Sequence, residues 1–148
     1  MTVVTPCLRG TLELAYATLF VTAFLAATLI PLPSELPLVA VVRATGDIGV
    51  PVLVATLGNY LGACTTYALA RRMLTARFAQ LARTHPRSTA WFQRYGAVTL
   101  LLSWVPVIGD VFVALAGAAA IRFPVFSLWV GIGKAARYAA VAWAVSRG

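Results

Sequence analysis

Prolines and an acidic residue interrupt a long apolar stretch near the N-terminus. Glu35 lies within the segment 29–39, between three prolines: Pro31, Pro33 and Pro37. Proline removes a backbone donor and breaks an α-helix. An ionisable side chain near the centre of a bilayer costs roughly 2.5–3.5 kcal/mol, so it normally faces a cavity or a partner. We therefore expect the chain to turn back at this segment, so that Glu35 faces a cavity or a partner.

The composition indicates that the solvent of this chain is a bilayer. Of its 148 residues, 61% are hydrophobic and only 11% are charged, with a mean hydropathy of +0.87. Soluble domains average roughly 45–50% apolar and about 25% charged residues. A soluble fold of this size has no core large enough to bury so much apolar surface. We therefore predict an all-α integral membrane protein with a single membrane domain, 1–148.

Three apolar stretches are compatible with helices. Residues 12–30 form the first, which ends at Pro31. Residues 50–70 are 21 residues without a formal charge, and a helix rising ~1.5 Å per residue needs about 20 residues to cross a hydrocarbon core of ~30 Å. Residues 123–145 form the last stretch. A further stretch, 97–121, is broken in its middle.

The interruption in that further stretch repeats the pattern around Glu35. Pro106, Gly109 and Asp110 lie where it should continue as a helix. A shift of 75 residues aligns two prolines, two acids, two glycines and two polar residues: Pro31 with Pro106, Glu35 with Asp110, Gly58 with Gly133, and Asn59 with Lys134. We interpret this register as an internal repeat.

The repeat predicts two halves of inverted topology. The first covers 12–70 with a hairpin tip near 31–37, and the second covers 96–148 with a tip near 106–110. Each would be a re-entrant broken hairpin followed by one transmembrane helix. One crossing per half gives the halves opposite orientations, an architecture that recurs in transporters.

The segment between the halves, 71–95, is strongly basic. It carries six arginines and no acid. The positive-inside bias predicts that it is a cytoplasmic connector, and its apolar residues at helical spacing favour an amphipathic helix at the membrane surface. Such a segment attracts anionic headgroups. We do not expect nucleic acid as a partner, because the segment lies between two membrane-embedded halves.

Four ionisable residues are candidates for chemistry inside the membrane. A low dielectric favours the protonated form of a carboxyl group, so Glu35 and Asp110 are candidate proton carriers. The alternative is a structural role, with both acids neutralised by nearby cations. Lys134 and Arg137 lie three residues apart, which places them on one face of a helix. They are either counter-ions for the two acids or ligands for an anionic headgroup, and both roles stay open.

The span 50–70 contains the pattern Gly58-Asn59-x-x-Gly62. Small residues at this spacing favour close helix packing in membranes. The side chain of Asn59 is in addition available to hydrogen-bond a hairpin tip.

The sequence contains no motif of an enzyme, a metal centre or a cofactor site. There is no GxSxG, no Walker loop and no cluster of ligating residues. His85 is the only histidine, and Cys7 and Cys64 are far apart without a CxxC. We therefore expect no enzymatic activity, no metal and no cofactor.

Several motifs together resemble a known family. They are Pro31-Leu-Pro-Ser-Glu35, Gly58-Asn59-x-x-Gly62, Ser103-Trp-Val-Pro-Val-Ile-Gly-Asp110, Gly117 and Gly133-Lys-Ala-Ala-Arg-Tyr138. In order and spacing they are similar to those of the DedA (VTT-domain, SNARE-associated) membrane proteins, and above all to the short YqaA-like branch. The resemblance covers roughly residues 15–145.

The resemblance implies two opposed re-entrant hairpins in the bacterial inner membrane. It also implies movement of phospholipid or undecaprenyl phosphate that depends on the proton-motive force. Glu35 matches the first-hairpin acid of the family, Asp47 lies where a second acid is expected, and Arg43 is a further candidate for a headgroup or counter-ion contact.

The sequence departs from the family at the second hairpin. DedA proteins usually carry arginines three positions before and three after the hairpin proline, and here those positions are Ser103 and Gly109. Lys134 and Arg137 would then supply the positive charge from the following helix. This departure leaves the lipid substrate and the direction of transport open.

We therefore expect a multi-pass inner-membrane transporter or flippase for a phosphate-bearing lipid, with membrane lipids and protons as its partners. A homo-oligomer is compatible with the sequence. Two alternatives stay open: a membrane assembly or envelope-homeostasis factor that transports nothing, and a small channel for ions or solutes.

Overall fold

All regular structure is helical in the part of the chain that the computed structural model describes, which is residues 6–28, 34–84, 86–105 and 108–147. This part forms six α-helices and one 3-10 helix. In chain order they are α1 (Pro6–Ala26), α2 (Glu35–Thr45), α3 (Gly49–Thr84), α4 (Pro86–Thr99), η1 (Leu100–Trp104), α5 (Ile108–Ala118) and α6 (Phe123–Arg147).

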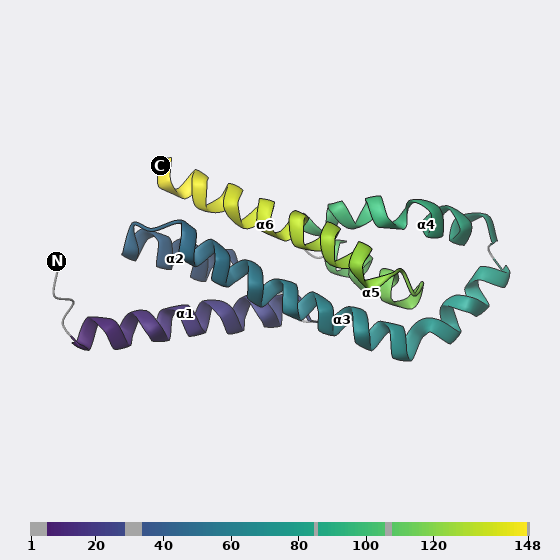
Figure 1. Ribbon diagram of the computed structural model, residues 1–148, viewed down its shortest axis with the longest axis horizontal. Helices are drawn as coiled ribbons and strands as arrows, with labels where there is room; N and C mark the ends of the chain where they lie inside the picture. The colour runs from purple at the N-terminus through teal and green to yellow at the C-terminus, as the bar shows by residue number, and fades with distance from the viewer. Residues whose placement is uncertain (1–5, 29–33, 85, 106–107, 148) are drawn as a thin grey trace.

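Three long helices, α1, α3 and α6, run along the long axis of the molecule (Figure 1). Helix α1 begins and α6 ends at one end of the molecule, whereas α3 passes into α4 at the other end. The two short helices pack across the chain: α2 packs chiefly against α6, and α5 packs chiefly against α3. Meanwhile α1 packs against α3, and η1 packs against α6. The short helices therefore tie the N-terminal and C-terminal parts of the chain together.

Glycines allow α1 and α3 to approach closely. A Cβ atom added to Gly58 would lie 2.5 Å from the carbonyl oxygen of Phe20, and one added to Gly62 would collide with the carbonyl oxygen of Phe24. A backbone carbonyl cannot move aside as a flexible side chain can. These contacts are the close packing that small residues at this spacing favour in membranes.

Two further contacts hold α3 against its neighbours. A Cβ atom on Gly117 of α5 would collide with the carbonyl oxygen of Tyr67. The hydroxyl of Thr66 donates to the carbonyl oxygens of Ala27 and Thr28, both at 2.9 Å, just beyond the end of α1. The last carbonyls of a helix lack partners within it, and this side chain brings a donor from α3 to the carbonyls at the end of α1.

The sequence predicted that the spanning helix ends near residue 70, but α3 continues to Thr84 and is 36 residues long. The basic segment is therefore the second part of α3 followed by α4, and no break separates it from the span. The reason is local. Residues 63–84 contain neither glycine nor proline, and alanine, leucine, arginine and methionine are all good helix formers. The next helix begins at Pro86, at the first helical position, where proline is favoured.

Among the described residues, one helix is both long enough and apolar enough to cross a bilayer by length and composition, over Gly49–Leu81. Gly10–Ala26 and Ile108–Ala118 are shorter apolar helices. Helix α1 ends at Ala26, earlier than the predicted residue 30, and α6 has 25 residues but carries Lys134 and Arg137 in its middle.

Gly62→Ala is expected to lower the free energy of unfolding by about 2–3 kcal/mol, because α1 must move away from α3. This value lies towards the upper end of the range for substitutions that overpack a core. Gly131→Ala is the matched control, since nothing lies within 4 Å of a Cβ atom there and alanine favours a helix by about 1 kcal/mol over glycine. Unfolding in mixed detergent micelles, followed by circular dichroism, measures both. Equal stability of the two variants would contradict the close approach.

Candidate functional site: a cluster of paired charges

Both hairpin acids lie at the beginning of a short helix. Glu35 is the first residue of α2, and Asp110 lies in the first turn of α5. Acids are stabilised at helix N-termini by the partial positive charge there. Pro37 lies within the first turn of α2, where a proline is tolerated because the N–H it lacks would have no partner in the helix.

The predicted hairpin tips are therefore partly helical. Residues 35–37 and 108–110 belong to α2 and α5, so the helices begin within the segments predicted as tips. Pro31, Pro33 and Pro106 lie outside the described residues.

Lys134 of α6 binds residues from two other helices. Its ammonium group lies 3.3 Å from Oδ1 of Asp110 in α5 and donates a hydrogen bond to Oδ1 of Asn59 in α3. The side chain of Lys134 is only 2% exposed, whereas that of Asp110 is 31% exposed. Among the described residues, Lys134 is therefore a buried cation with one charged and one neutral partner.

Arg137 forms a second ion pair beside the first. It lies about one turn further along α6 and pairs with Glu35 of α2. Its side chain is 13% exposed and that of Glu35 is 28% exposed. Residues three apart on a helix share a face, so α6 presents both cations to the starts of α2 and α5. We call Glu35, Asp110, Lys134, Arg137 and Asn59 the charge cluster.

The charge cluster brings together the two acids and the two bases that the sequence singled out. Two positive and two negative formal charges meet, which offsets the large cost of burying any of them alone. Each cation is more deeply buried than its acid. The carboxylates are therefore more accessible from the surroundings than the cations with which they pair.

Tyr138 connects the charge cluster to the start of α2. Its hydroxyl accepts a hydrogen bond from Nδ2 of Asn59 at 2.8 Å and lies 2.8 Å from Oγ of Ser34. The residue is fully buried. In the sequence, Tyr138 was singled out as part of the motif Gly133-Lys-Ala-Ala-Arg-Tyr138, and this role was not predicted. The available signal was a phenol hydroxyl inside an apolar helix, which needs a partner when buried.

Arg43 and Asp47, two of the predicted site residues, do not join the charge cluster. Arg43 lies in the last turn of α2, about 12 Å along the helix from Glu35 at ~1.5 Å per residue. Helix α2 ends at Thr45 and is followed by the C-cap residue Gly46, whose positive φ of 68° favours glycine. Asp47 then accepts a hydrogen bond from the backbone N–H of Gly49 at 3.0 Å, which stabilises the start of α3.

The remaining predicted glycines shape the surroundings of the charge cluster. A Cβ atom on Gly109, beside Asp110, would lie 2.5 Å from the carbonyl oxygen of Ser103, so η1 and the start of α5 touch through their backbones. Gly133 and Arg137 line a hollow of about 250 Å³ together with Leu101, Ala136 and Ala140. The small residues leave space beside the guanidinium group of Arg137.

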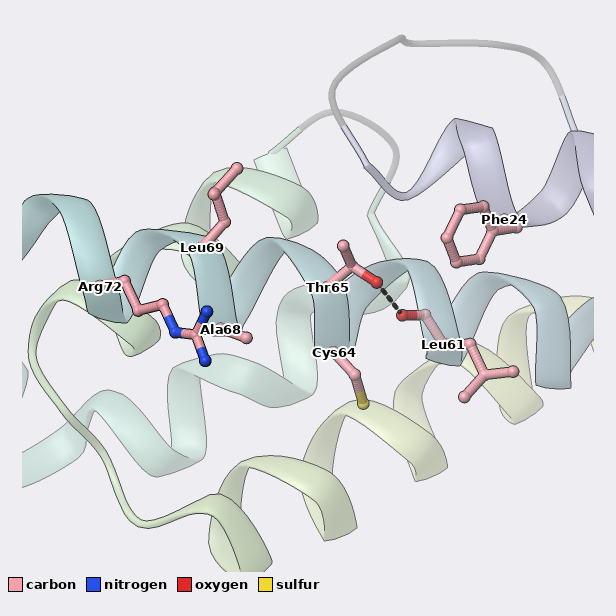
Figure 2. Close-up of a pocket in the computed structure, with 7 residues that line it drawn as sticks. All are labelled: Phe24, Leu61, Cys64, Thr65, Ala68, Leu69 and Arg72. Atoms are coloured by element: carbon pink, nitrogen blue, oxygen red, sulfur yellow. Dashed lines mark hydrogen bonds between the residues drawn. The ribbon is translucent and has the colours of Figure 1, made fainter.

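A larger hollow lies elsewhere on α3 (Figure 2). Its volume is about 590 Å³, and it is lined by Phe24 of α1 and by residues of α3 from Leu61 to Arg72. Its one hydroxyl, that of Thr65, already donates to the carbonyl oxygen of Leu61 at 3.0 Å. No residue of the charge cluster lines this hollow. Size alone therefore does not identify the candidate site, whose ionisable groups are those of the charge cluster.

Comparison with known proteins identifies the class of protein. Residues 30–147 match the VTT domain, so the chain belongs to the VTT-domain (DedA) family, as the resemblance predicted. It is 43% identical to the inner membrane protein YqaA of Escherichia coli, over 91% of this chain and 94% of the relative. The YqaA protein of Shigella flexneri gives the same values.

An uncharacterized protein of Haemophilus influenzae is 39% identical, over 83% of this chain and 82% of that protein. No solved structure matches the chain. Together with the apolar helices, these relatives establish a multi-pass protein of the bacterial inner membrane, as the sequence predicted.

Proposed function

We propose that this protein transports a phosphate-bearing lipid, a phospholipid or undecaprenyl phosphate, across the inner membrane in exchange for protons. The observation that carries the proposal is the pairing of Lys134 with Asp110 and of Arg137 with Glu35 inside an apolar chain. Ionisable residues at such positions are expensive to keep, and they usually mark substrate or proton pathways.

The charge cluster has the chemistry of an anion site. Two cations lie against the N-terminal ends of α2 and α5, and helix N-termini attract phosphate and carboxylate groups. In the resting arrangement, Glu35 and Asp110 are the internal anions. When a carboxylate takes up a proton, its cation loses its counter-charge and becomes able to bind a phosphate. Protonation and lipid binding would then be linked at the same residues.

We further propose that the chain consists of two inverted halves, each with a re-entrant hairpin followed by a transmembrane helix. Asn59 and Lys134, which are equivalent under the shift of 75 residues, bond to each other, as expected for equivalent residues beside a pseudo-two-fold axis. The packing is also reciprocal, since α2 lies on α6 of the other half and α5 lies on α3 of the other half.

The positions of the chain ends support the same topology. Helix α1 begins and α6 ends at one end of the molecule, and the basic junction of α3 with α4 lies at the opposite end (Figure 1). An odd number of crossings in each half gives this arrangement. By the positive-inside bias, the arginine-rich end would face the cytoplasm.

Reconstitution tests the proposal directly. The protein is placed in vesicles that contain a fluorescent phosphatidylglycerol, and an impermeant reductant reports the lipid in the outer leaflet. We expect faster transfer when an inward proton gradient is imposed than without it. A second set of vesicles, containing undecaprenyl phosphate, identifies the preferred lipid. Rates equal to those of protein-free vesicles for both lipids would rule out the transporter.

A second function is favoured by one observation. Both cations already have acidic partners, as expected if the charges only lock the helices of a membrane assembly factor. The variant Asp110→Asn/Lys134→Met removes one ion pair without leaving a buried charge. If this variant folds but no longer transfers lipid, then the ion pair takes part in transport. Full transfer would show that this pair is only structural.

A further inference from the structure

One hydroxyl group connects the two ion pairs. The phenol of Tyr138 lies 2.8 Å from both Oγ of Ser34 and Nδ2 of Asn59. Ser34 directly precedes Glu35, and Asn59 holds Lys134. Tyr138 therefore contacts a neighbour of each ion pair without contacting either acid through its hydroxyl.

Lys134 fixes the direction of the two hydrogen bonds that Asn59 makes. An ammonium group can only donate, so Asn59 must turn its carbonyl oxygen toward Lys134. Its amide nitrogen then faces Tyr138 and donates to the phenol oxygen. Between the phenol of Tyr138 and Oγ of Ser34, either oxygen is able to donate. The bonds thus form one connected chain from Lys134 to Ser34, and in a low dielectric each polarises the next.

The phenol oxygen reinforces the orientation of Asn59 that Lys134 requires. Without this oxygen, the amide NH₂ group loses its acceptor, and the side chain of Asn59 is held less firmly. Tyr138 thus favours the one orientation in which Asn59 helps to hold Lys134 against Asp110.

Tyr138 also takes the place of a helix cap. Ser34 is the N-cap residue of α2 but makes no side-chain capping bond, although a serine there usually accepts a hydrogen bond from the helix backbone. Its hydroxyl is bound to Tyr138 instead. The start of α2, and with it Glu35, is therefore tied to α6.

We propose that Tyr138 is a positioning residue of the charge cluster, whose hydroxyl orients Asn59 toward Lys134 and fixes the start of α2, so that the two ion pairs hold as one unit. A contribution of Tyr138 to transport rests on the proposed function. The positioning role itself can be measured even if the protein transports no lipid.

Hydrogen exchange in lipid nanodiscs, read by mass spectrometry, tests the proposal in four variants. The reporters are the first amides with acceptors inside each helix, at 39–42 in α2 and 112–115 in α5. Tyr138→Phe should exchange faster at both helix starts, about three- to tenfold as expected for one net hydrogen bond. Ser34→Ala should affect only α2, and Asn59→Leu should affect only α5.

The control is Tyr60→Phe, which also removes a tyrosine hydroxyl between α3 and α6, the one bonded to Ser127 at 2.5 Å. It should leave both helix starts within about twofold of the wild type. The proposal is overturned if Tyr138→Phe changes α2 alone, or if Tyr60→Phe changes both starts equally. If the hydrogen-exchange pattern is as expected but the protein moves no lipid in vesicles, then the positioning role is supported and the proposed function is ruled out.

Discussion

Glu35→Gln is expected to abolish proton-driven lipid transfer in reconstituted vesicles while leaving the protein folded and expressed. Glutamine keeps the shape of the side chain and still accepts a hydrogen bond from Arg137, but it cannot take up or release a proton. If Glu35 carries the proton that frees Arg137 for phosphate, then transfer should fall to the rate of protein-free vesicles.

The matched control is Glu13→Gln, which removes the same charge from an exposed position on α1, outside the charge cluster. It should transfer lipid at the wild-type rate under the same gradient. Undiminished transfer by Glu35→Gln would show that Glu35 is not a proton carrier, although Asp110 would remain to be tested in the same assay.

Asp110→Asn is expected to lower the free energy of unfolding by about 3–5 kcal/mol, the range for breaking a buried ion pair from one side. The loss is large because Lys134 is only 2% exposed and, among the described residues, keeps the neutral Asn59 as its hydrogen-bond partner. Lys134→Met should cost less, since Asp110 is 31% exposed and can be solvated.

Adding Lys134→Met to Asp110→Asn should restore most of the lost stability, because no uncompensated charge then remains buried. Denaturation in mixed micelles, followed by circular dichroism, measures all three variants. If the double variant is as unstable as the sum of the single variants, then the two side chains are not energetically coupled.

The members of the site were predictable from the sequence, but their pairing was not. An acid or a base in an apolar stretch is conspicuous, so Glu35, Asp110, Lys134 and Arg137 stand out by composition alone. The partners depend on which helix packs across which. Helix α2 lies on α6 rather than on its neighbour α3, and no local spacing encodes that choice.

Polar groups on mostly apolar residues were harder to recognise. A tyrosine in an apolar helix resembles an interfacial aromatic. The hydrogen bonds of the Tyr138 hydroxyl become apparent only when the positions of Ser34 and Asn59 are known. Asp47, which the resemblance marks as a second acid, lies in a glycine-rich turn, where an acid is well placed to cap the start of the next helix. It does so here for α3.

The end of α3 was misplaced for a different reason. The change in composition at Arg71 and Arg72 marks where apolar sequence stops, but helix propensity does not follow polarity. Arginine is nearly as good a helix former as leucine, so the helix passes through the change and ends only at Thr84, before Pro86.

The uninterrupted length of α3 couples movement of its apolar part to movement of its basic end. Its 36 residues measure about 54 Å at ~1.5 Å per residue, whereas a hydrocarbon core of ~30 Å takes up about 20 of them. Counted from Gly49, the core ends near residue 69, just before Arg71 and Arg72. The same helix contains the apolar part and the basic part, and it turns toward α4 near its end (Figure 1). A tilt of the apolar part would therefore also move the basic end where α4 begins.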